Sequence, residues 1–453
     1  MKLKRMISSI VCLTLIAGFN ISAKAEESKN GEEKFKVITE VFDFGPQTTK
    51  IVIDTNKEID GSTVNKNTFK VLAKNEINDN KMKEINREVV NAYVTDKELG
   101  EVAPTGKYIT LELKYGMNVD GAGILLWNND KFSNEEVKLN YVVTQENDMK
   151  TKDGQELTKN NTSYVMNGVK NLLVDDFSKG KSKSGLNYRY FSPAKDDKKN
   201  PLVIWLHGAG EGGLSNTTQI SANRGAIAFA TKESQNIFGG AYVLAPQTPS
   251  YWMPSFMVGD LELVGEKDYT PDVVSLIKEF IKENPDVDAS RVYIGGCSMG
   301  GYQTIQTVAA APELFAAAFP ICPAYEPKED ELKRMSSVPT WLTHVATDPT
   351  APVSNSQISY KTLKNFGGDV FYTEYETVER DGNVYDSHAS WIYTLQNDPV
   401  NEKGQHIFNW LADQKLKSEN KTNQNNNIAI YTVVSIVVVG LGIVLFMKKK
   451  NNK

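Results

Sequence analysis

Ser298 lies between glycines two positions before it and two positions after it, in the segment Gly296-Cys297-Ser298-Met299-Gly300. The residues before this segment favour a strand, and those after it favour a helix. A strand that turns sharply into a helix strains the serine backbone and leaves no room for side chains at the two flanking positions. The pattern therefore predicts a nucleophile elbow, with the Ser298 hydroxyl presented at the end of a strand.

A serine hydroxyl needs a neighbouring base to react near neutral pH, and the chain has four histidines that could supply one. In α/β-hydrolases the nucleophile comes first along the chain, then the acid, then the base. His207 precedes Ser298, His344 ends a predicted strand, and His406 belongs to a predicted terminal helix. His388, in a polar loop between the last predicted strand and that helix, is therefore the predicted base, and the other three are expected to have packing or hydrogen-bonding roles.

The carboxylate that orients the base is expected in a loop just after a sheet strand. Asp348 follows the predicted strand Thr340–Val345 and meets this requirement. Asp381 and Asp386 remain alternatives, although both are close in sequence to His388 and do not follow a strand in the usual way. We predict Asp348 as the acid.

A glycine-rich loop, His207 to Gly213, follows the predicted strand Pro201–Leu206. Backbone amides in such a loop can approach a developing negative charge because no side chains are in the way. We predict that the amides of Ala209 and Met299 form an oxyanion hole; the alternative is a plain turn.

The elements that must position these residues fall into two regions. From about Lys34 to Tyr141, short alternating runs separated by Asn, Gly, Asp and Lys clusters predict an all-β sandwich. This region has no histidine and no cysteine, so we expect a binding or spacer module there. Beyond about Gly168, apolar strands alternate with helices, which predicts a mostly parallel sheet flanked by helices. The predicted domains are 26–165 and 166–414.

The second region has strand-like and helix-like segments in alternation. The predicted strands are 201–206, 241–244, 292–294, 315–319, 340–345 and 370–375, and the predicted helices are 271–283, 303–310 and 402–414. About 240 residues are sufficient for one hydrophobic core.

The two ends of the chain predict that the domains between them lie outside a membrane. Residues 1–25 combine a basic start, an apolar run and a small-residue cleavage pattern, which is typical of a secretory signal peptide; an uncleaved anchor is the alternative. Residues 428–447 are uncharged and would cover roughly 30 Å as a helix, enough to span a bilayer. The lysines in 448–453 predict a cytoplasmic tail, and 415–427 is a polar stalk. We expect an extracellular body on a single-pass transmembrane helix.

Composition excludes some functions and leaves one question open. The net charge of −5 is mild and indicates no nucleic-acid partner. Cys297 and Cys322 could form a disulfide in a secreted protein or remain two buried thiols. The predicted chemistry needs no metal and no organic cofactor.

Three segments resemble a known family: Asp288–Tyr302, Leu206–Glu211 and His388–Trp391. They are similar to secreted bacterial esterases of the predicted-peptidase group, which is related to polyhydroxybutyrate-depolymerase-like and feruloyl-type esterases and, more distantly, to prolyl oligopeptidases. The resemblance covers about Leu202 to Leu411. It implies an α/β-hydrolase fold, and some members carry an immunoglobulin-like domain before it, as the β-rich region here would be.

The resemblance implies the same roles for Ser298, His388 and Asp348, with Ala209 and Met299 as oxyanion donors. The acid loop departs from the family pattern, because Val345 follows His344 where a glycine is usual. The resemblance also places several residues near the substrate pocket: Glu211, Gln247, Trp252 and Trp391.

These observations predict an extracellular, membrane-anchored serine hydrolase that acts on carboxylic esters through a Ser-His-Asp triad. The substrate would be an ester-containing small molecule, or a polysaccharide or lipid ester. A serine peptidase of prolyl-oligopeptidase type is an alternative, although no domain of β-propeller size is present to restrict access. A catalytically idle cell-surface binding protein is the third hypothesis.

Overall fold

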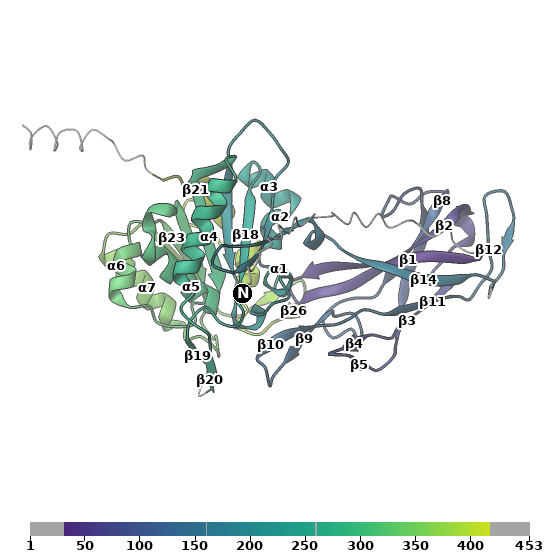
Figure 1. The fold of residues 1–453 in the computed structure, drawn as a ribbon, viewed down its shortest axis with the longest axis horizontal. Coiled ribbons are helices and arrows are strands. Elements are labelled where there is room, and N and C mark those ends of the chain that lie inside the picture. Colours follow the sequence, from purple (N-terminus) through teal and green to yellow (C-terminus); the bar gives the residue numbers. More distant parts are fainter. Residues whose placement is uncertain (1–30, 160, 259–260, 417–453) are drawn as a thin grey trace, which may run out of the picture.

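The computed structural model describes residues 31–159, 161–258 and 261–416. Figure 1 shows a β-rich body, in purple to blue, beside a body of strands and helices, in teal to yellow. The predicted signal peptide, transmembrane segment 428–447 and basic tail lie outside the described residues. Within the described ranges, no helix has the length and apolar character needed to cross a bilayer.

The N-terminal body is the predicted sandwich of strands. One sheet has the order β14-β1-β2-β8-β7, and a second has the order β11-β3-β6. Alternate residues of these strands point inward, as in β11, where residues 141, 143 and 145 are buried and 142 and 144 are exposed. The bounds are β1 Glu32–Phe42, β2 Gly45–Asp60, β3 Phe69–Ala73, β6 Ile85–Arg87, β7 Val89–Thr95, β8 Thr105–Leu113, β11 Tyr141–Gln145 and β14 Ser163–Asn171.

The predicted boundary between residues 165 and 166 falls inside a strand and is displaced. β14 pairs in parallel with β1, so the N-terminal sheet continues to Asn171. No residue of β14 is fully buried. Its inward residues, such as Tyr164 and Met166, are only partly buried against the core, which is why the sequence places the boundary too early.

The C-terminal body is built on a sheet of order β15-β16-β18-β17-β21-β22-β23-β24. Six of these strands run parallel to one another: β18, β17, β21, β22, β23 and β24. The strands β15 and β16 add an antiparallel edge beside β18. The sheet is thus mixed rather than uniformly parallel. Its strands are β15 Ser178–Lys181, β16 Asn187–Phe191, β17 Asn200–Leu206, β18 Tyr242–Gln247, β21 Val287–Cys297, β22 Ala317–Ile321, β23 Thr340–Val345 and β24 Val370–Tyr375.

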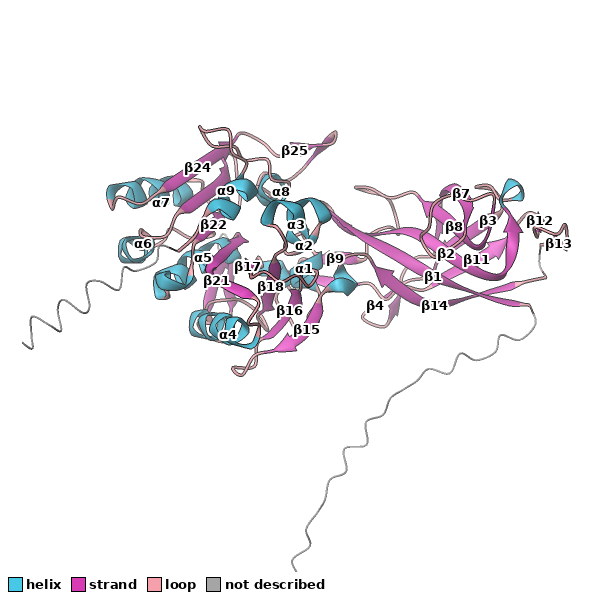
Figure 2. Ribbon diagram, turned by 90° about the horizontal axis from the view of Figure 1, so that it is seen from above, coloured by secondary structure: helices cyan, strands magenta, loops and turns pink. Residues whose placement is uncertain are grey.

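Helices cover both faces of this sheet (Figure 2). One hydrophobic cluster joins the sheet to α4, α5, α6 and α7, and a second joins its other face to α2, α3 and α9. The bounds are α1 Thr218–Ser221, α2 Ile227–Ala230, α3 Lys232–Phe238, α4 Thr270–Glu283, α5 Met299–Ala310, α6 Glu329–Met335, α7 Ser354–Asn365, α8 Trp391–Leu395 and α9 Ile407–Asp413. Because both faces are covered, β17 is buried along its whole length, and all of its residues after Asn200 are apolar.

The terminal helix α9 begins at Ile407, five residues later than predicted. The side chain of Asn401 accepts hydrogen bonds from the backbone amides of Lys403 and Gln405, and Gly404 has a φ of 75°. This turn satisfies the amides that a longer helix would have used.

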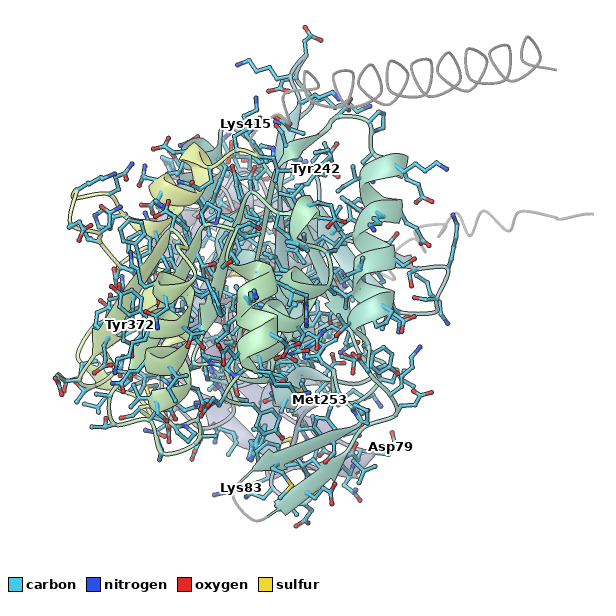
Figure 3. The ribbon with its side chains drawn as sticks, turned by 90° about the vertical axis from the view of Figure 1, so that its left-hand side faces the viewer. Asp79, Lys83, Tyr242, Met253, Tyr372 and Lys415 are labelled. Carbon is cyan, nitrogen blue, oxygen red and sulfur yellow. The ribbon has the colours of Figure 1, made fainter. Side chains whose placement is uncertain are left out.

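The carboxyl ends of the parallel strands meet at one edge of the sheet. In Figure 3, Tyr242 at the start of β18 and Met253 just beyond its end lie at opposite ends of the domain. A hairpin of β19 Ser255–Val258 and β20 Leu261–Val264 projects from the Met253 side. A hairpin of the N-terminal body, β9 Leu125–Asn128 with β10 Ser133–Glu136, projects on the same side (Figure 1).

Candidate active site

Ser298 joins β21 to α5 with φ 55° and ψ −117°, a strained conformation for a residue with a side chain. A Cβ at Gly296 or at Gly300 would collide with the carbonyl oxygen of Leu206 at the end of β17. The two glycines therefore allow the turn to pack against the neighbouring strand. The structure has the nucleophile elbow that the sequence predicts.

His388 connects the serine to a buried carboxylate. Its Nε2 lies 2.9 Å from Ser298 Oγ, and its Nδ1 lies 2.8 Å from Asp348 Oδ2. Since a carboxylate can only accept, Nδ1 carries the proton and Nε2 is free to accept the serine proton. The structure thus joins Ser298, His388 and Asp348, the three residues that the sequence predicts, by hydrogen bonds.

Four donors surround Asp348, whose side chain is fully buried. The backbone amides of Thr350 and Ala351 bind Oδ1, and His344 Nε2 lies 3.2 Å from Oδ2, to which His388 also binds. Burial by itself would raise the pKa of Asp348, but the hydrogen bonds from the two histidines hold it well below its usual range. Asp348 is therefore ionised near neutral pH.

His344 has the hydrogen-bonding role that the sequence predicts. Its Nε2 approaches both Asp348 and the carbonyl oxygen of Ala351, and its Nδ1 lies 2.8 Å from Ser356 Oγ. The imidazole is completely buried and connects the acid loop to α7. It fixes the orientation of the Asp348 carboxylate.

The two alternative acids do not contact the imidazole of His388. Asp386 accepts a hydrogen bond from the backbone amide of His388 at 2.8 Å, which shapes the histidine loop. Asp381 is exposed beside Arg380, 3.8 Å from its Nε.

His207 anchors the glycine-rich loop after β17. Its Nδ1 donates to the carbonyl oxygen of Gly208 at 2.7 Å, and its Nε2 accepts from the amide of Thr248 at 3.2 Å. Trp252 Nε1 donates to the His207 carbonyl oxygen at 2.9 Å and its ring packs on the imidazole. Burial lowers the pKa of His207 to about 4, so the ring is neutral and keeps this hydrogen-bond pattern.

The two predicted oxyanion donors begin adjacent elements. Ala209 opens a 3-10 turn, η3 Ala209–Glu211, after β17, and Met299 opens α5 after β21. β17 and β21 are hydrogen-bonded neighbours, so these two starts lie side by side. The amide of a first helical residue has no partner within its helix and can bind a ligand oxygen.

A cleft of about 500 Å³ opens at Ser298 and is lined mainly by apolar groups. The lining residues are Trp127, Phe132, Gly208, Ala209, Gly210, Glu211, Asn223, Met257, Cys297, Ser298, Ala324, Thr350, Ala351, Asp386, His388, Ala389 and Trp391. None of them is lysine or arginine. This wall suits an uncharged substrate.

The β9–β10 hairpin of the N-terminal body forms part of this cleft through Trp127 and Phe132. Asn134 Nδ2 donates to the Gly210 carbonyl oxygen at 3.0 Å, and a Cβ on Gly210 would lie 2.5 Å from the Trp127 ring. The sequence prediction of a separate binding or spacer module missed this contribution. The only signal was a tryptophan in a polar segment of a domain that has no other.

The four predicted pocket residues divide into two pairs. Glu211 and Trp391 line the cleft, whereas Gln247 and Trp252 are buried behind the loop and support it. Gln247 Nε2 donates to the Glu211 carbonyl oxygen at 2.9 Å, and its Oε1 accepts from the amide of Asn216. The prediction was therefore wrong for Gln247 and Trp252, because their side chains turn toward the inside of the domain.

Cys297 and Cys322 are both free and buried, so the open question of a disulfide resolves as two thiols. Burial raises the pKa of Cys322 to about 12 and that of Cys297 well above its usual value, which keeps both thiols protonated. Cys322, Asp348 and His388 place potential ligand atoms within 4.8 Å of one another. In this group, the Asp348 carboxylate and the His388 imidazole are hydrogen-bonded to each other.

Comparisons with known proteins agree with this architecture. Residues 34–158 match the esterase Ig-like N-terminal domain, and residues 191–384 match the phospholipase/carboxylesterase family. The crystal structure of a thermostable esterase is 31% identical, with a TM-score of 0.70, over 84% of this chain and 99% of that one. No curated protein gave a match.

Other solved structures are less similar to this chain. The acylaminoacyl peptidase of Pyrococcus horikoshii is 16% identical, with a TM-score of 0.37, over 55% of this chain and 43% of that one. Brefeldin A esterase, a bacterial homologue of human hormone-sensitive lipase, is 13% identical, with a TM-score of 0.33, over 44% and 67%. The two domain matches and the full-length similarity to an esterase show that this chain belongs to the esterases with an immunoglobulin-like N-terminal domain and a carboxylesterase-type α/β-hydrolase domain.

Proposed function

We propose that the protein is an extracellular, membrane-anchored carboxylesterase that cleaves esters through an acyl-enzyme on Ser298. The observation that carries the proposal is His388, which lies 2.9 Å from the Ser298 hydroxyl and 2.8 Å from the Asp348 carboxylate. These contacts match the roles of nucleophile, base and acid in acyl transfer.

In the first half of the reaction, His388 Nε2 takes the proton of Ser298 as Oγ attacks the ester carbonyl carbon. The negative charge that develops on the carbonyl oxygen is stabilised by the amides of Ala209 and Met299. The bond to the alcohol oxygen then breaks, and His388 gives its proton to the departing alcohol. The Asp348 carboxylate stabilises the imidazolium between these two transfers.

In the second half, water replaces the alcohol. His388 accepts a proton from the water as its oxygen attacks the acyl carbon, and the same amides bind the oxyanion. The bond to Ser298 Oγ breaks, the acid leaves, and the proton on His388 returns to the serine. The cycle needs only groups that line the cleft or support them.

The cleft supports a neutral ester as substrate. Its walls are mainly apolar, and no cationic side chain is present among its lining residues to bind an anionic group. An ester-containing small molecule, or an ester on a polysaccharide or lipid, fits this chemistry.

The location is part of the proposal and rests on the sequence of the two ends. Residues 1–25 would direct secretion, and residues 428–447 would anchor the body outside the membrane. Protease treatment of intact cells should remove the catalytic body, while the basic tail remains protected. Recovery of the intact body from the cytosolic fraction would overturn this part.

The enzymatic proposal is tested with the detergent-solubilised full chain and short aryl esters. We expect hydrolysis by the wild type, and a loss of about 10³-fold or more in Ser298→Ala and in His388→Ala. A fluorophosphonate should label the wild type and not Ser298→Ala. Activity surviving in both variants would contradict the assignment, and faster cleavage of matched anilides than of esters would favour a peptidase.

A further inference from the structure

Glu211 places a carboxyl group on the wall of the cleft that the proposed reaction does not use. The residue ends the turn η3, two positions after the oxyanion donor Ala209, and it is only 8% exposed. Its neighbours on the wall include Asn223 and Cys297. A buried carboxyl group is rare unless it has a partner or a function.

The backbone of Glu211 is firmly held, whereas its carboxyl group is not. The carbonyl oxygen accepts hydrogen bonds from Gln247 Nε2 and from Thr218 Oγ1, both at 2.9 Å. In the side chain, Oε1 has Asn134 Nδ2 at 3.5 Å, at the limit of a hydrogen bond. Among the described residues, Oε2 has no hydrogen-bond partner although it is buried. The loop therefore does not need this carboxyl group to hold its shape.

The carboxyl group lies next to the reacting centre. A Cβ on Gly208 would be 3.1 Å from Glu211 Oε2 and 3.6 Å from Cys297 Sγ. The carboxyl group and Cys297, the residue that precedes Ser298, thus both lie beside Gly208. A substrate group that reached it would be separated from the ester carbonyl by only a few bonds.

The chemistry of the group indicates what it would bind. Burial raises the pKa of Glu211 to about 7, and the amide of Gly208 opposes this only partly. The ionisable side chains on the same wall are the protonated thiol of Cys297, His388 and Asp386, and none is a permanent cation. A neutral carboxyl group both donates and accepts, which matches a hydroxyl group.

We propose that Glu211 is a specificity-determining residue whose carboxyl group binds a hydroxyl group of the substrate close to the scissile ester. The substrates are then hydroxyl-bearing esters rather than purely hydrocarbon ones. This inference rests on the proposed esterase function. It does not fix whether the hydroxyl belongs to the acyl or the alcohol part, so the experiment has one arm for each.

The test compares ester pairs in which a terminal methyl is replaced by a hydroxyl of similar size. The acyl arm pairs ethyl butanoate with ethyl 3-hydroxypropanoate, and the alcohol arm pairs propyl butanoate with 2-hydroxyethyl butanoate. Wild-type full chain should prefer the hydroxylated ester in one arm by about tenfold in kcat/KM, the effect of one hydrogen bond. Hydrolysis is followed by pH-stat titration.

Variants then assign the preference to the carboxyl group. Glu211→Leu should lose the tenfold preference, so that the ratio of kcat/KM between the two members of a pair approaches one, whereas Glu211→Gln, which still donates and accepts, should keep most of the preference. Asn134→Ala is the matched control for the loop, because it removes the hydrogen bond to the Gly210 carbonyl oxygen and the 3.5 Å contact with Glu211 Oε1 but keeps the carboxyl group that would bind a hydroxyl. It should lower the rates on both members of a pair equally.

Several results would overturn the inference. Equal rates on both members in both arms with wild type would do so without any variant, as would an equal loss on both members in Glu211→Leu. If Glu211→Leu does not melt cooperatively, Glu211→Met supplies a flexible apolar side chain for the same comparison. Failure of the proposed function looks different, since wild type would then hydrolyse none of the four esters faster than Ser298→Ala.

Discussion

Two buried carboxyl groups flank Ser298, and their pKa values are shifted in opposite directions. Asp348 receives hydrogen bonds on both oxygens, and its pKa is held well below its usual range. Glu211 has one oxygen without a protein partner among the described residues, and burial raises its pKa to about 7. The difference shows that the number of donors aimed at a buried carboxyl group, rather than burial itself, decides its charge.

The two pKa shifts suit the two sides of the reaction that we propose. An anion at Asp348 stabilises the positive charge that forms on His388. On the other side, negative charge develops beside Ala209 and Met299, and an ionised Glu211 would oppose it. A neutral carboxyl group beside the oxyanion loop avoids this repulsion.

The largest expected effect comes from removing the charge of Asp348. Asp348→Asn keeps the shape of the side chain but cannot stabilise the imidazolium or hold Nδ1–H as a donor, so kcat should fall by about 10⁴-fold. Steady-state hydrolysis of an aryl ester measures this, with thermal unfolding as the control for the fold. A decrease smaller than tenfold would mean that another carboxylate acts as the acid.

Glu211→Gln should change how stability depends on pH. The pKa of Glu211 is about 7 in the folded state and about 4.5 when exposed. Between these values the folded protein binds the proton more tightly, so the carboxyl group makes stability fall as pH rises through the window of about 4.5 to 7. Above the window the buried carboxylate lowers the free energy of unfolding by about 3 kcal/mol. Gln has no charge to bury, so the variant does not lose this stability.

Denaturant unfolding of wild type and Glu211→Gln at pH 5 and pH 8 checks this linkage. The variant should be more stable relative to wild type at pH 8 than at pH 5. An equal difference at both values would show that Glu211 does not titrate in this range, and the contrast with Asp348 would then be smaller than inferred.

His344→Ala makes the surroundings of Asp348 more like those of Glu211. The change removes one donor from Oδ2 and leaves the hydroxyl of Ser356 without its imidazole partner. The pKa of Asp348 should rise, and the fold should lose about 1–3 kcal/mol of stability. His406→Ala, at an exposed histidine outside the cleft, is the matched control. An equal loss of stability in the control would show that the hydrogen bonds of His344 do not stabilise the fold more than those of an exposed histidine.

The parts of the site that local sequence determines could be predicted. Glycines at 296 and 300 are required by the close approach of Leu206, and chain order together with position in a polar loop separates His388 from the other histidines. These features depend on neighbours in sequence and on the topology of one sheet. The strands 340–345 and 370–375 were predicted with their observed bounds for the same reason, because β-branched and aromatic residues make up most of each segment.

The missed parts depend on how distant segments pack. Trp252 faces inward because its indole donates to the His207 carbonyl oxygen, a contact that no local pattern encodes. Trp127 reaches the cleft only because the hairpin that carries it packs on Gly210 of the other domain. Sequence periodicity gives the side of a strand that is buried but not the domain that will cover it.

The smallest expected effect tests whether that hairpin maintains the state of Glu211. Trp127→Ala removes an indole that is 46% exposed and packs on Gly210, so the KM for apolar esters should rise about five- to tenfold. Water would also reach Glu211 more easily, which lowers its pKa toward the usual value. Leu214→Ala, at an exposed side chain outside the cleft, is the control and should change neither quantity.

The decisive measurement is the stability gain of Glu211→Gln at pH 8 in the two backgrounds. If the hairpin keeps water from the carboxyl group, the gain should be smaller with Trp127→Ala than with the wild-type hairpin, because a hydrated carboxylate costs less. An undiminished gain would show that the hydrolase domain alone keeps the pKa of Glu211 raised. The N-terminal domain would then shape the cleft without influencing the charge beside the oxyanion loop.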